Sequence, residues 1–141
     1  MSALLEVRAF GDAMDRMHSG MKSGMDMNAT DLAALRMLIM REQRGVAVSP
    51  RDLADHLRIS TASTTKLLDR LTESGHLERR PHPRDGRARV VVLTDASRRE
   101  FFQQLGEKIL EMRGAAQKYS EDELAVVTRF MSDVGAVMDG D

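Results

Sequence analysis

The chain has 141 residues, with 21 Lys and Arg against 22 Asp and Glu, four His and no Cys. This length suits one domain, or one domain with helical extensions that pair with a second copy. Hydrophobic residues make up 42% and charged residues 30%, which is typical of a globular protein rather than a disordered or fibrous one. Because Cys is absent, disulfides, thiolate metal sites and cysteine redox switches are excluded.

No segment is expected to cross a membrane, because purely apolar runs such as residues 90–93 are only a few residues long. The first residues include Glu6, Arg8, Asp12 and Asp15 and lack an unbroken apolar core, which argues against a signal peptide. We therefore expect a cytoplasmic protein.

The charge is unevenly distributed along the chain. From Arg58 to Arg89 there are eight Lys and Arg but only four Asp and Glu, so this segment is +4 and the remainder is -5. A basic patch on an acidic body is typical of proteins that bind an anionic partner such as nucleic acid. A merely solvated basic surface is the alternative.

The N-terminal half is predicted to begin with two helices. Apolar residues at spacings of three and four predict a first helix that ends near residues 20–24. These apolar residues are Val7, Phe10, Met14, Met17 and Met21. Either Asn28 or Thr30 can cap a second helix, which ends near residues 44–45. Residues 46–48 are predicted to form a minimal strand.

Two short helices follow, separated by a tight turn. Ser49 and Pro50 are a typical N-cap and first helical position, and the helix they start would bury Leu53, Ala54 and Leu57. Ser60 can cap the next helix, which runs from about residue 61 to 74 and stops at Gly75. Its inward face is predicted to consist of Thr64, Leu67, Leu68 and Leu71. The outward face is then small, hydroxylated and basic, with Thr61, Ala62, Thr65, Lys66 and Asp69.

The C-terminal half is predicted to contain a hairpin and two helices. Residues 76–80 and 87–93 alternate like strands around a loop with two prolines and a glycine, and the hairpin carries five arginines. Thr94 would cap a long helix whose apolar stripe contains Phe102, Leu105, Ile109, Met112 and Ala116. Ser120 and Glu123 form a capping box for the last helix. That helix has a nearly heptad stripe made of Leu124, Val127, Met131, Val134 and Met138.

These elements predict a mainly α fold with a small β-hairpin. Two short helices joined by a tight turn, the second with an exposed polar face, make a helix-turn-helix, and the basic hairpin is its wing. We expect a winged helix-turn-helix domain at residues 28–94 and a linking helix at 95–116. The terminal regions 1–27 and 117–141 are expected to form a helical dimerisation bundle, although packing within one chain is the alternative.

Two stretches of this region resemble the MarR family of bacterial winged-helix regulators. The first contains Leu53-Ala54, Leu57, Ile59-Ser60, residues 66–71 and residues 75–79; the second is the wing, residues 80–87, followed by residues 90–94. The resemblance implies an obligate homodimer on a pseudo-palindromic operator, usually as a repressor. It also implies that residues 61–74 are the recognition helix, that Arg87 enters the minor groove and that Asp85 fixes the hairpin tip. The chain departs from the family pattern at His82, where an acid is common, and at Gly86.

The candidate DNA-binding residues combine this resemblance with chemistry. Guanidinium, ammonium and hydroxyl groups suit phosphates and base edges, and a planar guanidinium on a thin hairpin suits the narrow minor groove. The candidates are Ser60, Thr61, Ala62, Thr65, Lys66, Arg70, Arg84, Asp85, Arg87 and Arg89. For Arg70 an ion pair with Asp69, Glu73 or Asp85 is an equally good interpretation.

A small-molecule effector, phenolic or otherwise aromatic, is a further implication of the resemblance, with a wall made of Met14, Met17, His18, Met37 and Met40. The same methionines could simply fill helix interfaces. No nucleophile motif, phosphate loop or metal motif is present, so we expect no enzyme activity and no cofactor. A protein-interaction module that binds no DNA, and a metal sensor built from its scattered histidines, remain alternatives.

Overall fold

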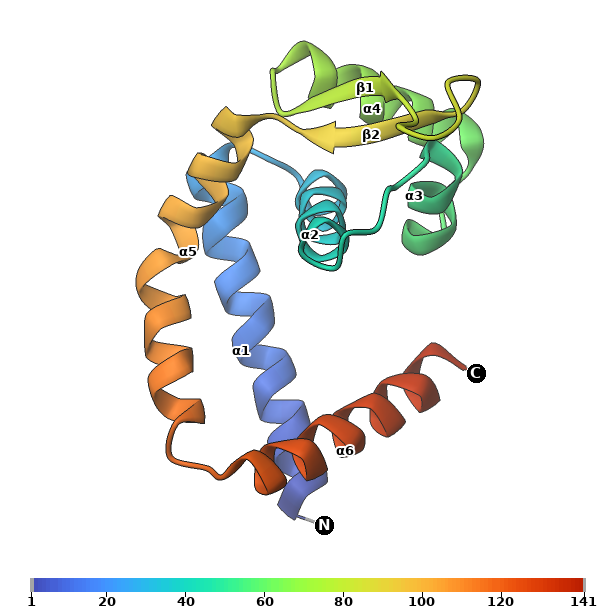
Figure 1. Cartoon of the computed structure of the whole chain (residues 1–141). Coiled ribbons are helices and arrows are strands. Elements are labelled where there is room, and N and C mark those ends of the chain that lie inside the picture. The colour runs from blue at the N-terminus through green and yellow to red at the C-terminus, as the bar shows by residue number, and fades with distance from the viewer. Residues whose placement is uncertain (1, 141) are drawn as a thin grey trace. The chain divides into compact units, whose positions relative to one another are not determined.

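The computed structural model describes residues 2–140, and they form six helices and one hairpin (Figure 1). The chain order is α1 (Ser2–Met25), α2 (Ala29–Gln43), α3 (Pro50–Leu57), α4 (Thr61–Glu73), β1 (Leu77–Pro81), β2 (Arg89–Leu93), α5 (Asp95–Ala116) and α6 (Glu121–Asp139). The mainly α winged helix-turn-helix expected from the sequence is confirmed. None of the described helices is long and apolar enough to cross a membrane. The chain divides into two compact units, one up to Gln104 and one from Leu105 onward.

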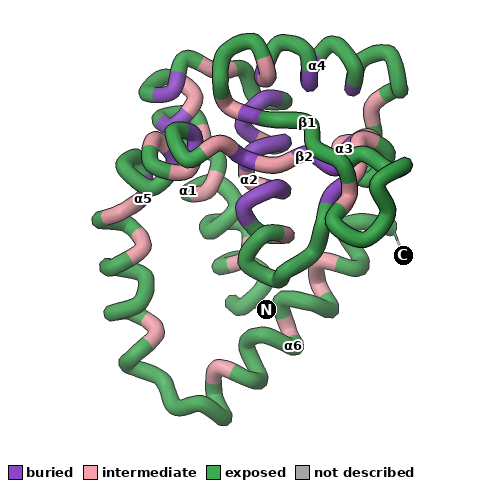
Figure 2. Tube along the Cα trace, turned by 45° about the horizontal axis from the view of Figure 1, so that its top comes forward, coloured by how far each residue is buried: buried purple, intermediate pink, exposed green. Residues whose placement is uncertain are grey.

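The core of the first unit lies where α2, α3, α4 and the hairpin meet. Leu32 and Leu35 from α2, Leu53 from α3, Leu67 from α4 and Leu77 from β1 are almost completely buried. Figure 2 shows the buried positions gathered on these elements. Full burial of a leucine side chain contributes roughly 2 kcal/mol, so these contacts hold the helix-turn-helix as one body.

Local capping sets the helix boundaries. Asn28 accepts the Asp31 N–H at 2.8 Å and so caps α2, which decides between the two expected caps. Ser49 and Asp52 form a capping box at α3, with Pro50 at its first position. Ser60 accepts the Ser63 N–H at 3.0 Å at the start of α4. The chain leaves α4 through Gly75, which has a φ of +82°. Glycine adopts this left-handed conformation readily because glycine lacks a Cβ.

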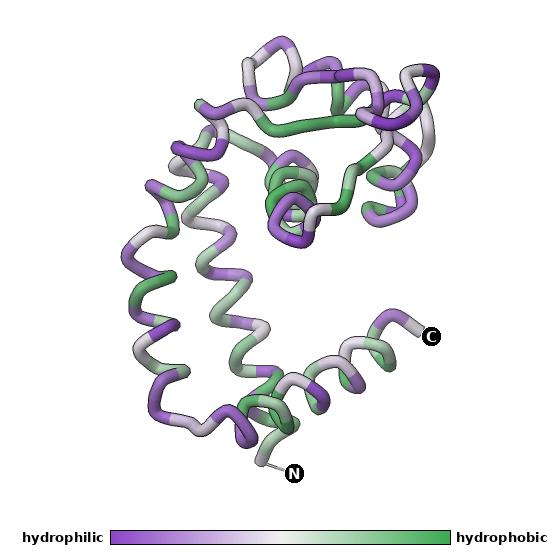
Figure 3. Tube along the Cα trace, viewed as in Figure 1, coloured by the Kyte–Doolittle hydropathy of each residue, from purple (hydrophilic) through white to green (hydrophobic). Residues whose placement is uncertain are grey.

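The hairpin has one buried and one exposed strand. β1 and β2 are antiparallel, with Leu77 opposite Leu93 and Arg80 opposite Val90. β2 buries Val90, Val91 and Leu93, whereas β1 is exposed beyond Leu77. Figure 3 shows the same contrast in hydropathy between the two strands. The apolar strand therefore faces the core and leaves the arginines of β1 at the surface.

The minimal strand predicted at residues 46–48 is wrong. That segment makes a single backbone bond to the hairpin, from the Val91 N–H to the Val48 carbonyl at 2.8 Å. Gly45 with a φ of +70° ends α2 just before it, and Ser49 already caps α3 just after it. A ladder needs repeated bonds between two strands, and this segment makes only the one.

The apolar stripe predicted for α5 is also shifted by one residue at its start. Phe101 is 5% exposed and Phe102 is 39% exposed, with their rings edge to face at 6.0 Å. Thr94 accepts the Ser97 N–H at 3.1 Å and so sets the phase of the helix. Ser97 and Phe101, four residues apart, then share the buried face.

The second unit contains the end of α5 and all of α6. Ser120 and Glu123 form the expected capping box, with the two reciprocal bonds at 3.1 and 2.9 Å. These bonds lower the pKa of the Glu123 carboxyl below its ordinary value, because the charged form is the better acceptor. No described residue of α6 is buried, and Val126, Val127, Met131, Val137 and Met138 are exposed.

Candidate DNA-binding surface

The helix-turn-helix is formed by α3, α4 and the turn between them. Arg58 takes the left-handed conformation with a φ of +55°, and the Ile59 N–H donates to the Ala54 carbonyl, so the turn is tight. On α4 the predicted inward residues Thr64, Leu67, Leu68 and Leu71 are all buried. The opposite face exposes Thr61, Ala62, Thr65 and Lys66. The helical phase predicted for this element is therefore confirmed.

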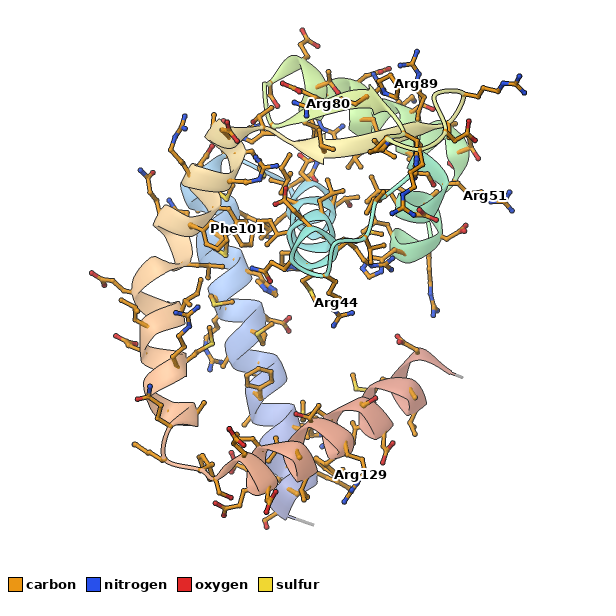
Figure 4. All side chains as sticks on the ribbon, in the orientation of Figure 1. Arg44, Arg51, Arg80, Arg89, Phe101 and Arg129 are labelled. Atoms are coloured by element: carbon orange, nitrogen blue, oxygen red, sulfur yellow. The ribbon has the colours of Figure 1, made fainter. Side chains whose placement is uncertain are left out.

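A hollow of about 610 Å³ lies in the angle between α3 and α4, where it is lined by residues 59–61, Thr64 and Thr65 and by four residues of α3. Among the α3 residues is Arg51, which projects outward from the helix (Figure 4). Arg51 is not among the candidates predicted from the sequence. The sequence could have indicated Arg51 as a candidate, because it directly follows Pro50 at the start of α3. The first helix of a helix-turn-helix crosses the DNA backbone, so an exposed cation there can reach a phosphate.

The hydroxyl groups at the start of α4 differ in whether they already form hydrogen bonds within the protein. The Ser60 hydroxyl accepts from the Ser63 N–H and donates to the Ser63 hydroxyl at 2.9 Å. The Thr65 hydroxyl donates to the Thr61 carbonyl at 3.1 Å. The Thr61 hydroxyl has no bonding partner within residues 2–140, so it is the one of these three whose proton is ready for a phosphate oxygen.

Ion pairs divide the seven basic residues from Lys66 to Arg89 into two groups. Arg70 pairs with Asp31 at 2.5 Å, Arg79 with Asp69 at 2.6 Å and Arg80 with Glu78 at 2.5 Å. In the part of the chain that the structure describes, four exposed cations of this segment pair with no acid: Lys66, Arg84, Arg87 and Arg89. Free exposed cations are the groups that exchange counterions for phosphates.

The partner of Arg70 is not one that the sequence suggested. Its Nε and Nη2 atoms donate to Asp31 Oδ1 at 3.2 and 2.5 Å, whereas Asp69, Glu73 and Asp85 were expected. The Asp31 side chain is only 8% exposed, and the hydrogen bond to it raises the pKa of Arg70. Arg70 thus ties α4 to the start of α2, which gives it a structural role even though its own side chain is half exposed.

The tip of the hairpin is held by side chains that accept backbone N–H groups. Asp85 Oδ1 accepts the Arg87 N–H at 3.1 Å, and the Asp85 carbonyl accepts the Ala88 N–H at 3.0 Å. His82 Nδ1 lies 3.0 Å from the Arg84 nitrogen. The loop therefore has a defined shape, from which Arg84, Arg87 and the β2 residue Arg89 extend as exposed side chains.

The structure does not bring the five predicted effector-wall residues into one cavity. Met37 is buried in the core and Met40 is 54% exposed, while Met14 and Met17 are half-buried on α1. Only His18 lines a groove, of about 310 Å³, between α1 and α2; the other lining residues are Asp15, Ser19, Lys22, Ala29, Leu32 and Arg36. Within residues 2–140, no three His, Asp or Glu side chains gather closely enough to hold a metal ion.

The chain is similar to several known proteins. It is 25% identical over 135 residues to the uncharacterized HTH-type transcriptional regulator YcgE of Bacillus subtilis, a match covering 94% of this chain and 83% of YcgE. It is 24% identical over 98 residues to the HTH-type transcriptional repressor YetL of the same species, covering 70% of this chain and 59% of YetL. A solved structure of a MepR mutant from a multidrug resistant S. aureus clinical isolate is similar with a TM-score of 0.74 at 15% identity, covering 98% and 97% of the two chains. Another MepR mutant, bound to an oligodeoxyribonucleotide, has a TM-score of 0.60 at 16% identity and covers 98% of each chain.

The helix-turn-helix, the basic hairpin and these similarities together define a winged helix-turn-helix transcriptional regulator with a DNA-binding domain. Residues 25–88, which span α2 to the wing, match the model described as MarR family. The helix-turn-helix and wing of this chain are therefore similar to those of the MarR family.

Proposed function

We propose that this protein binds duplex DNA as a homodimer on a pseudo-palindromic operator and represses transcription without any catalytic activity. In this arrangement α4 enters the major groove, and Arg87 on each wing enters the adjacent minor groove. The observation that carries the proposal is the set of four exposed cations without acidic partners, Lys66, Arg84, Arg87 and Arg89. The names of the repressor YetL and of the oligodeoxyribonucleotide-bound MepR mutant support it.

The homodimer is supported by apolar residues that each terminal helix leaves exposed. Within α1, Leu4, Leu5 and Phe10 are 48 to 63% exposed. Within α6, Val127 and Met131 belong to the nearly heptad stripe and are 49% and 38% exposed. Several large apolar side chains exposed on both terminal helices are unusual on a monomer, and a second copy would bury them. We therefore assign residues 1–27 and 117–141 to dimerisation.

We expect the protein to bind DNA from upstream of its own gene as a dimer, with an affinity that falls steeply with salt. If the four unpaired cations of each copy meet phosphates, affinity should fall by about a thousandfold or more between about 50 and about 200 mM salt. Fluorescence anisotropy across a salt series measures the slope. The stoichiometry of the complex tests the dimer.

A duplex with a shuffled sequence is the control for specificity, because the salt-dependent contribution alone does not depend on sequence. Equal binding to both duplexes, or a flat salt response, would reject the proposed function. In that case the protein-interaction module, which needs no free cations on the hairpin, becomes the better hypothesis.

We further infer that an effector relieves repression by binding the groove between α1 and α2. Burial lowers the pKa of Arg36, and Arg36 has no acidic partner among residues 2–140. Burial and the nearby Arg36 also lower the pKa of His18, against the opposing effect of Asp15. Because half-buried cations are stabilised by a bound anion, a small aromatic carboxylate or phenolate fits this groove better than a neutral ligand does. Its volume of about 310 Å³ suits such a molecule.

Benzoate and 4-hydroxybenzoate are suitable probes for this groove. We expect them to bind the free protein and to weaken DNA binding, because an effector must favour the conformation that fits two half-sites poorly. Arg36→Gln should reduce ligand affinity by at least about tenfold, because it removes a charge-assisted hydrogen bond. Arg44→Gln is the matched control, since Arg44 is exposed and lies outside the groove. Calorimetric titration that detects no binding, or equal binding to both variants, would contradict the inference.

A further inference from the structure

The wing loop, residues 82–88, offers few acceptors for its own backbone N–H groups. Pro81 and Pro83 have no N–H, and each restrains the residue before it to an extended conformation. The loop is closed by the His82 N–H, which donates to the Ala88 carbonyl at 2.9 Å. Between these points the N–H groups of Arg84 and Asp85 need an acceptor.

His82 provides that acceptor from its own side chain. Its Nδ1 lies 3.0 Å from the Arg84 nitrogen and 3.3 Å from the Asp85 nitrogen, and both backbone N–H groups donate to it. A ring nitrogen accepts only when it carries no proton, so these bonds require the neutral imidazole with its hydrogen on Nε2. Asp85 in turn accepts the Arg87 N–H at 3.1 Å. One series of side-chain acceptors thus runs from His82 to Arg87.

We propose that His82 is a positioning residue of the wing, which in its neutral form fixes the loop so that Arg84 and Arg87 are presented to DNA. The proposal rests on the proposed function, because it assumes that the wing contacts DNA. A proton on Nδ1 would turn the acceptor into a third donor facing two N–H groups, and the turn would lose both bonds. The wing would then bind DNA in its fixed shape only while His82 stays neutral.

The charges around the loop are mixed. The loop and the two strands that carry it hold Glu78, Arg79, Arg80, Arg84, Asp85, Arg87 and Arg89. Three helices contact these strands: α3 adds Arg51, Asp52, Asp55 and His56, α4 adds Lys66, Asp69, Arg70 and Glu73, and α2 adds Asp31, Arg36, Arg41 and Glu42. Arg80 is already paired with Glu78, and Asp85 is already engaged with the Arg87 N–H. The test therefore lowers the pH through the range in which histidine side chains in general gain a proton, about pH 5 to 8.

The test compares wild type with His82→Asn between about pH 7.5 and about pH 5.5. Asparagine keeps a short acceptor oxygen but does not titrate, so it isolates His82 from the other histidines. We expect wild-type DNA affinity to fall about tenfold more than that of His82→Asn as the pH decreases, which corresponds to losing two ordinary hydrogen bonds. In the absence of DNA, the amide NMR signals of Arg84 and Asp85 should move with pH in wild type and stay in place in His82→Asn.

A second variant separates positioning from folding. His82→Ala has no acceptor at any pH, so we expect about tenfold weaker DNA binding already at about pH 7.5, with an unchanged urea midpoint because the loop is exposed. Parallel pH curves for wild type and His82→Asn would overturn the proposal, as would wild-type affinity that rises at low pH because protonated His82 contacts phosphate. If Arg87→Ala also has no effect, the proposed function has failed; if Arg87→Ala weakens binding, only the role of His82 has failed.

Discussion

We expect Arg87→Ala to weaken binding to operator DNA by about tenfold to a hundredfold, as removal of one good guanidinium interaction per protomer predicts. Arg87 is exposed and forms no ion pair within the described residues 2–140, so its charge is fully available to the groove. Only its backbone N–H is bound, by Asp85 at 3.1 Å, and alanine keeps that bond. Anisotropy at fixed salt measures the decrease in affinity.

Two controls define what this result means. Arg44→Ala removes the same charge from the end of α2, where Figure 4 shows Arg44 pointing away from α4 and the hairpin, and it should leave DNA affinity unchanged. Urea midpoints should agree for all three proteins, because exposed side chains away from special contacts contribute little to stability. Should Arg44→Ala and Arg87→Ala lose affinity equally, the wing would have no special role.

The second large effect is expected on stability, from Arg70→Met. Methionine fills much of the same space but leaves the buried Asp31 carboxylate without its cation. An uncompensated buried charge costs several kcal/mol; since Arg70 is itself half exposed, we expect a decrease of about 2 kcal/mol in the free energy of unfolding. Urea denaturation at neutral pH measures this decrease.

The double variant Asp31→Asn with Arg70→Met tests whether the cost comes from the orphaned charge. We expect it to recover more than half of the stability that Arg70→Met removes, because neither partner then carries a buried charge. Additive effects would show that the pair is not coupled. The salt slope of DNA binding separates this role from direct binding to DNA. If Arg70 neutralised a phosphate, its replacement would lower the slope by about one per protomer.

The features that the sequence predicted best are helix boundaries and helix faces, because these depend on residues close together in the chain. Ser60 and Gly75 delimit α4, and the spacing of its leucines determines which face is exposed, so α4 was predicted with its correct helical phase. The α5 stripe failed at Phe102 because the sequence offers two adjacent phenylalanines, and only the cap at Thr94 decides between them.

Ion pairs between residues far apart in the sequence could not be predicted from local patterns. The Arg70–Asp31 pair joins residues 39 positions apart, and Arg98 binds Glu42 across 56 positions. Any of several acids could have paired with either arginine. The effector wall stays a prediction. Methionine spacing locates a helix face, whereas the tertiary packing of α1 on α2 decides which residues line the groove that contains His18.

The Arg70–Asp31 pair has a thermodynamic consequence for control. Asp31 lies in the first turn of α2, between Ala29 and Leu32, which both line the groove proposed for the effector. If the proposals above hold, a ligand in that groove and a duplex on α4 would both act on the first turn of α2, the duplex through the Arg70–Asp31 pair. Linkage makes such coupling reciprocal, so the factor by which the ligand weakens DNA binding must equal the factor by which DNA weakens ligand binding. Protein that is bound to a promoter would then have a lower affinity for the ligand than free protein has.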